Sequence, residues 1–125
     1  MFGEDKLFTA LNVAAIQAKV DALTSGYAIW SDLLIPQDFT GTKSINFYMS
    51  SRLPESEVDM YNYTINCRAE TMNEAMDISN TIISTVSRKS YTDCFIYMTQ
   101  MAIIPPIDDT DSYNSVIEAI IKLRS

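Results

Sequence analysis

Hydrophobic residues recur along the chain with two different periods, and these periods predict helices and strands in a fixed order. Apolar residues at helical spacing mark residues 5–23 and 71–86. Strict alternation of apolar and polar residues, which is typical of a half-buried strand, marks residues 44–50 and 60–69. A longer apolar run covers residues 93–104. The pattern therefore predicts a helix, a β-hairpin, a second helix and a closing pair of strands.

The first predicted helix, Asp5–Leu23, has apolar residues on two nearly opposite sides. Leu7 and Leu11 begin one stripe, which continues in alanines. The second stripe consists of Val13, Ile16, Val20 and Leu23. A helix on the surface of a monomer normally has a single apolar stripe. The second stripe is therefore buried either within this chain or against a neighbouring subunit, and both interpretations stay open. Gly26 is expected to cap the end of this helix.

The two alternating segments, Ser44–Ser50 and Met60–Ala69, predict an antiparallel hairpin with one packed face. Their connection, residues 51–59, is long for a hairpin, and such loops are often used for contact. Leu53 and Val58 lie in it and have no obvious apolar partner within the hairpin, so we interpret them as further subunit-contact residues. The same connection contains an exposed acidic set, Glu55, Glu57 and Asp59.

The second helix is predicted over Thr71–Val86, because Thr71 and Glu74 have the spacing of a capping box. In the strand predicted over residues 93–104, apolar residues occupy both alternating sides, which predicts that both faces are covered. The final segment, Tyr113–Arg124, fits a strand and also a helical stripe. We favour the strand, because the preceding strand then gains a partner across a turn.

The fold class that follows is α+β, with an antiparallel sheet of about four strands, the hairpin plus two later strands, packed against two helices. A length of 125 residues, with 47% hydrophobic and 20% charged residues, fits a single domain over residues 1–125. The first residues lack the pattern of a signal peptide, and no apolar run reaches membrane-spanning length, so no membrane association is expected.

The composition excludes most catalytic chemistry. The chain has no His, which removes Ser-His-Asp and Cys-His mechanisms and His-ligated zinc sites. Its three glycines are too far apart for a phosphate-binding loop. Asp108, Asp109 and Asp111 lack the glycine and the terminal glutamate of a calcium loop. Cys67 and Cys94 are expected to be buried thiols. No catalytic residue, metal site or cofactor is therefore predicted.

The net charge of −7 argues against tight binding of nucleic acid, because neutralising the phosphates needs clustered Lys and Arg. An acidic protein can nevertheless surround DNA without retaining it, since a wall of like charge lets a polyanion slide past.

Taken in order, the segments resemble the phage tail-terminator, or tail-completion, proteins. The resemblance is one of pattern and extends over nearly the whole chain, through residues 7–23, 29–36, 44–69, 71–86 and 94–125. The stretch Ala69–Met76, which leads from strand to helix, is the most similar part, together with Asp111–Tyr113 before the alternating final segment. The apolar junction Ile103–Ile107 departs from the family pattern, which leaves the pairing of the last strand open.

The resemblance implies a structural, non-enzymatic virion protein at the phage neck or tail, assembled in the host cytoplasm. Such proteins form a closed ring, here of about six or twelve copies. The ring caps the tail tube or joins it to the head, contacts portal, connector and tail proteins, and lets DNA pass through its lumen without specific binding. In such a ring the acidic connection Glu55–Asp59 faces the lumen or solvent.

Two alternatives stay open. Within the same class, the protein is a head–tail connector or another neck adaptor ring. In a different class, it is a ferredoxin-like cytosolic ligand-binding regulatory module, which would use a polar row on the second strand of the hairpin. That row consists of Asn62, Thr64, Asn66 and Arg68.

Overall fold

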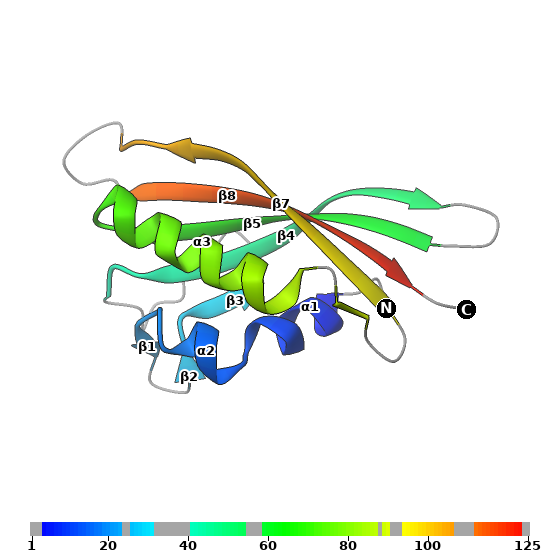
Figure 1. Cartoon of the computed structure of the whole chain (residues 1–125), viewed down its shortest axis with the longest axis horizontal. Coiled ribbons are helices and arrows are strands. Elements are labelled where there is room, and N and C mark those ends of the chain that lie inside the picture. The colour runs from blue at the N-terminus through cyan, green and yellow to red at the C-terminus, as the bar shows by residue number, and fades with distance from the viewer. Residues whose placement is uncertain are drawn as a thin grey trace.

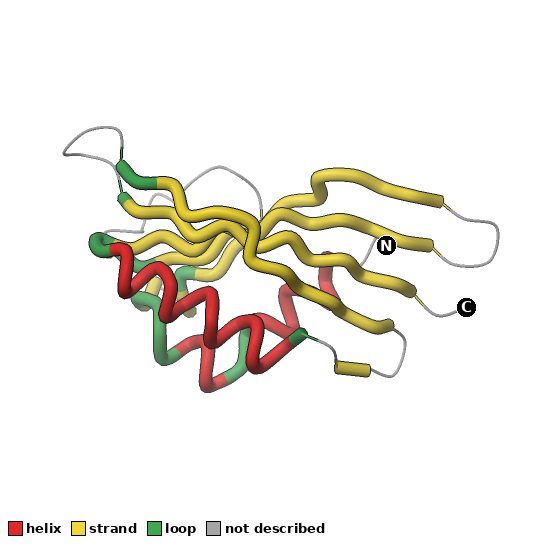
Figure 2. The backbone as a smooth tube through the Cα atoms, turned by 45° about the horizontal axis from the view of Figure 1, so that its top comes forward, coloured by secondary structure: helices red, strands yellow, loops and turns green. Residues whose placement is uncertain are grey.

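A layer of helices lies on one face of a twisted β-sheet in the computed structural model of the chain (Figures 1 and 2). The structure describes residues 4–23, 26–31, 41–54, 59–87, 89–90, 94–106 and 112–123. Along the chain, the elements are α1 (Glu4–Leu11), α2 (Ala14–Gln17), β1 (Ala22–Leu23), β2 (Gly26–Tyr27), β3 (Ile29–Ser31), β4 (Ser44–Pro54), β5 (Asp59–Ala69), α3 (Met72–Val86), β6 (Lys89–Ser90), β7 (Cys94–Ile104) and β8 (Tyr113–Leu123).

The main sheet has the strand order β3-β4-β5-β8-β7-β6. Its centre consists of β4, β5, β8 and β7, each 11 residues long and each antiparallel to its neighbour. At one edge β3 pairs in parallel with β4, and at the other β6 pairs with two residues of β7. The α+β class is confirmed, and so is the strand interpretation of the final segment, which lies between β5 and β7. The sheet is nevertheless mixed and larger than the four strands predicted.

The β4–β5 hairpin is longer than its sequence pattern suggested. β4 continues to Pro54 and β5 starts at Asp59, so the connection is residues 55–58 and not residues 51–59. The pairing of β4 with β5 shifts between Met49 and Ser51, which marks a β-bulge. Because a bulge adds one residue to one strand, it interrupts the alternation of faces. The alternating pattern therefore stopped at Ser50, although the strand does not.

The first predicted helix is wrong as a single element, because it breaks at Asn12. The backbone N–H of Asn12 donates to the Phe8 carbonyl oxygen at 3.1 Å, and its side-chain amide donates to the same oxygen at 2.9 Å. Asn side chains compete in this way with helical hydrogen bonding. Val13 is then extended (φ −111°, ψ 157°), and the short helix α2 starts in a new direction. Gly26 does not cap this helix; it begins β2, with φ 157°.

The main core lies between α3 and the centre of the sheet. On α3, the buried residues are Ala75, Ile78, Ser79, Ile82 and Val86. They pack on inward residues of β5, β8 and β7: Tyr61, Tyr63, Ile65, Cys67, Cys94, Ile96, Met98, Ile117, Ala119 and Ile121. Leu7 and Leu11 of α1, with Ile16 of α2, extend this core toward β3 and β4. One continuous core therefore joins the helices to the sheet.

A short polar network crosses this core. The Gln100 amide donates to the Ser115 hydroxyl at 3.0 Å, and that hydroxyl lies 3.0 Å from the Ser79 hydroxyl. Ser79 in turn donates to the Met76 carbonyl oxygen at 3.0 Å. Buried hydroxyls are costly unless they are paired, so this chain favours one position of α3 over β7 and β8.

A carboxylate fixes the segment that leads into β4. Asp21 accepts backbone hydrogen bonds from Thr42 at 2.6 Å and from Lys43 at 2.9 Å. A Cβ atom at residue 41 would collide with the same carboxylate, so Gly41 allows this close approach. The turn before β4 is thereby held against the segment between α2 and β1.

We expect Ile82→Ala to lower the free energy of unfolding by roughly 2–5 kcal/mol, because Ile82 is fully buried and its removal leaves a cavity. Ile83→Ala is the matched control, since Ile83 is only partly buried against the same core, and its loss should be clearly smaller. Urea unfolding followed by circular dichroism measures both. Equal losses would contradict the orientation of α3 described above.

Candidate interaction surfaces

The helices of the described residues lie on one face of the sheet, and the opposite, open face carries none of them (Figure 2). The polar row of β5, Asn62, Thr64, Asn66 and Arg68, lies on this open face, and each of its residues is half-buried. On the neighbouring strand β8 these residues pair with Ile120, Glu118, Val116 and Asn114, in that order. The Asn114 amide donates to the Asn66 side-chain oxygen at 3.3 Å. The row is therefore part of a mixed polar and apolar surface.

The expectation that both faces of β7 are covered is wrong. Cys94, Ile96 and Met98 are buried under α3, whereas Tyr97 on the open face is 36% exposed. Beyond Met98, Met101 is 58% exposed and Ile104 is 48% exposed. A bulge between Gln100 and Ala102 disturbs the register here. The apolar run was identified correctly, but the helical layer reaches only one face of this strand and only its first half.

The predicted contact stripe of the first helix does not exist as a continuous surface. Val13 is exposed at the start of α2, whereas Ile16 is fully buried in the core of this same chain. Val20 packs partly against that core, and Leu23 is half-buried in β1. The break at Asn12 separates these residues, because it turns α2 away from the axis of α1. Ile16 is therefore excluded from any surface that meets a partner.

A small apolar surface does remain beside α1. Phe8 and Met49 are 44% and 43% exposed, and the Phe8 ring centroid lies 6.4 Å from that of Phe47. Phe47 and Met49 occupy alternate positions on β4, which places both on the helix side. The sequence pattern did not single out Phe8, because it lies between the two stripes expected for a longer helix.

The hairpin connection stays largely untested. Glu55, Glu57 and Val58 lie outside the described residues, as do the side chains of Leu53 and Asp59. Their backbones place Leu53 in β4, opposite Met60, and Asp59 in β5, opposite Pro54 and Leu123. Figures 1 and 2 show this end of the hairpin extending beyond the helical layer. It is therefore a projecting part of the molecule.

The side chains of the described residues that could take part in chemistry, such as the two cysteines, serve the fold. Cys67 and Cys94 are thiols buried in β5 and β7, as predicted, and burial raises the pKa of the Cys67 thiol. Among the described residues, no group of three or more Cys, Asp or Glu side chains is placed to hold a metal ion. Asp108, Asp109 and Asp111 lie outside those residues. No helix in the described ranges is long and apolar enough to cross a membrane.

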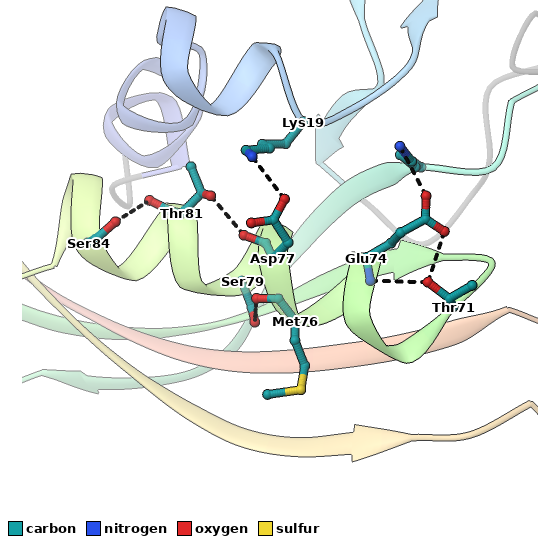
Figure 3. Close-up of polar contacts among 9 residues, drawn as sticks. Lys19, Thr71, Glu74, Met76, Asp77, Ser79, Thr81 and Ser84 are labelled. Atoms are coloured by element: carbon teal, nitrogen blue, oxygen red, sulfur yellow. Dashed lines mark hydrogen bonds and ion pairs between the residues drawn. The ribbon is translucent and has the colours of Figure 1, made fainter.

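The outward face of α3 carries paired charges. The Lys19 ammonium lies 2.9 Å from the Asp77 carboxylate, and the Lys43 ammonium lies 3.1 Å from the Glu74 carboxylate. Figure 3 shows Lys19 reaching Asp77, and Thr71 beside Glu74 at the start of the helix. The Thr71 hydroxyl accepts from the Glu74 backbone N–H at 3.2 Å and donates to its carboxylate at 3.0 Å. The predicted capping arrangement at this helix start is confirmed.

Comparison with models of protein families and with curated proteins gives no match. Among solved structures, the fold is similar to that of a chain in a structure described as "Virion of native gene transfer agent (GTA) particle". The TM-score is 0.63 at 7% sequence identity, and the likeness covers 95% of this chain and 92% of that chain. At this identity, the likeness establishes a shared α+β fold over nearly the full length of both chains.

The capping pair predicts a pH-dependent contribution to stability. Hydrogen bonds, from Lys43 first and then from Thr71, lower the pKa of the Glu74 carboxyl below its ordinary value. The folded pKa is thus below the unfolded value of about 4.3, so the contribution is complete above that value and is lost as the pH falls through the folded pKa. The difference in urea midpoint between wild type and Glu74→Gln should be present at neutral pH and vanish in acid. Lys43→Met should reduce it, whereas a difference that is constant with pH would contradict this origin.

Proposed function

We propose that this protein is a structural, non-enzymatic component of a phage-like virion, and that its copies form a ring at the neck or tail end of the particle. The observation that carries the proposal is the fold likeness to a chain of a gene transfer agent virion, which extends over 95% of this chain and 92% of the other. A likeness that covers nearly the full length of both chains supports a common architecture more strongly than one confined to a local motif.

The exposed apolar residues support assembly with other copies or with neighbouring virion proteins. Phe8 and Met49 form one candidate contact region, Val13 is exposed separately at the start of α2, and Tyr97, Met101 and Ile104 lie along β7 as another candidate region. The projecting hairpin, with Leu53 and Val58 near its tip, is a third. Because these regions differ, a contact between copies can join unlike surfaces, and a head-to-tail contact closes into a ring when its rotation allows.

The charge of the chain supports a conduit that does not retain DNA. A net charge of −7 repeated in every copy gives the assembly a strongly negative surface, which repels the phosphate backbone. In this proposal Glu55 and Glu57 of the connection, together with Asp59 at the start of β5, face the lumen or the solvent. The partners are then portal or connector proteins on one side and tail proteins on the other.

Sedimentation velocity and negative-stain electron microscopy of the purified protein test the proposal. We expect closed rings with an open centre, formed by the protein alone or after addition of the neighbouring virion proteins. No retention of duplex DNA is expected in a gel-shift assay at about 0.15 M salt, an ionic strength at which contacts between opposite charges are still appreciable. A protein that stays monomeric at every concentration, with those partners present, would overturn the ring.

The position within the particle distinguishes the tail-end ring from the head–tail connector. An antibody or an affinity tag detected on intact particles by electron microscopy should label the neck or the tail end at a single level. Label at the head-proximal level would favour the connector, and label distributed along the tail or over the head would contradict both positions.

A further inference from the structure

β7 lies near one edge of the sheet, and only its first part is covered. β6 pairs with Phe95 and Ile96 alone. Next to them, the Ser87 hydroxyl accepts from the Met98 backbone N–H at 2.8 Å and donates to the Met98 carbonyl oxygen at 3.3 Å. Beyond Met98, no strand among the described residues pairs with the outer side of residues 99–104. This stretch therefore offers backbone donors and acceptors to a further strand.

The side chains along this edge strand, β7, are unusual for a monomeric protein. The eleven residues Cys94–Ile104 include no charged side chain, although 20% of the whole chain is charged. Monomeric proteins commonly protect an edge strand with Lys or other charges. Here the edge instead presents Met101, exposed at 58%, and Ile104, exposed at 48%. Backbone pairing combined with apolar side chains is how an added strand is recognised.

At the opposite edge of the sheet, β4 also has a stretch whose outer side is unpaired among the described residues. β3 pairs only with Ile45, Asn46 and Phe47 of β4, and no described strand covers the outer side of β4 from residue 48 to Pro54. The registers place Pro54 level with Cys94, across Asp59 and Leu123. The open part of β4 therefore lies at one end of the sheet, and the open part of β7 lies at the other end and on the other side.

We propose that residues 99–104 of β7 in one copy pair with residues 48–54 of β4 in the next copy, so that the sheets of neighbouring subunits continue into one another. The strands suit this pairing, because three antiparallel steps separate β4 from β7 and the two run in opposite directions. A second copy in the same orientation thus presents an antiparallel β4. The stagger between the open ends is also what closure of a sheet into a barrel requires.

A second copy fits this edge better than a charged partner does. Each copy carries a net charge of −7, so two copies approach most easily through strands that add no negative charge: residues 99–104 have no charged side chain, and the only charged residue among 48–54 is Arg52. The contact is also heterologous, joining unlike edges, which is the type that generates rings. The inference rests on the proposed function, since it names the surfaces by which the proposed ring is built.

Engineered disulfides test the pairing in the full-length protein. Ser50 and Met101 are both exposed, while the native thiols are buried, so a protein with Ser50→Cys and Met101→Cys presents only the new pair. Under mild oxidation, we expect this double variant to give a ladder of covalent multimers on a denaturing gel. Met101→Cys alone and Met101→Cys with Ser84→Cys on α3 are the controls, and neither should give a ladder. Dimers from Met101→Cys alone would indicate a β7–β7 contact and overturn the proposal.

A charge substitution keeps the test independent of the disulfide register. Met101→Lys should weaken assembly by about tenfold or more with an unchanged melting temperature, whereas the control Ser84→Lys adds the same charge and should assemble normally. If rings form equally well with Met101→Lys, the edge pairing is wrong and the proposed function stands. If the unmodified protein forms no assembly, even with its virion partners, both the edge pairing and the proposed ring are wrong.

Discussion

The packing of α3 on the middle of the sheet is the contact on which the rest of the molecule depends. Fully buried residues of α3, among them Ile82, meet the inward side chains of β5, β8 and β7. Each of these strands alternates between an inward and an outward face, so covering the inward face settles the register of all three. The Ser79–Ser115 contact then selects the position of the helix along the strands. The remaining elements are placed relative to this unit.

The same arrangement explains why apolar side chains remain uncovered. In the part of the chain that the structure describes, one long helix and two short ones form a single layer, and a single layer covers only one face of a sheet. β7 lies toward the margin of this layer, and its second half extends past the part that α3 buries. Tyr97, Met101 and Ile104 are therefore exposed because the helices are too small to cover the whole sheet. These exposed residues give the molecule candidate contact regions.

The sequence predicted those parts of the fold whose signal is local. The hydroxyl and carboxylate of Thr71 and Glu74 marked the start of α3, and regular alternation marked β5 and the final strand. The break at Asn12 escaped prediction, because the apolar spacing runs on while a side-chain amide ends the helix. The parallel pairing of β3 with β4 depends on residues distant in the sequence, and the coverage of β7 depends on the number of helices available. For the same reason the contact residues were only partly found: Val13 is exposed, Ile16 is not, and Phe8 was missed.

The two bulges have a consequence for how this architecture tolerates change. Each falls on an outer long strand, at Ser50 in β4 and at Met101 in β7, while the pairing of β5 with β8 runs without interruption. An additional residue has therefore been accommodated twice at the flanks without altering the alternation at the centre. Among proteins related to this one, insertions and deletions should accumulate in β4, in β7 and in the loops that connect these strands to their neighbours. The central pair should keep a constant length, because a single added residue there would turn half of the interior outward.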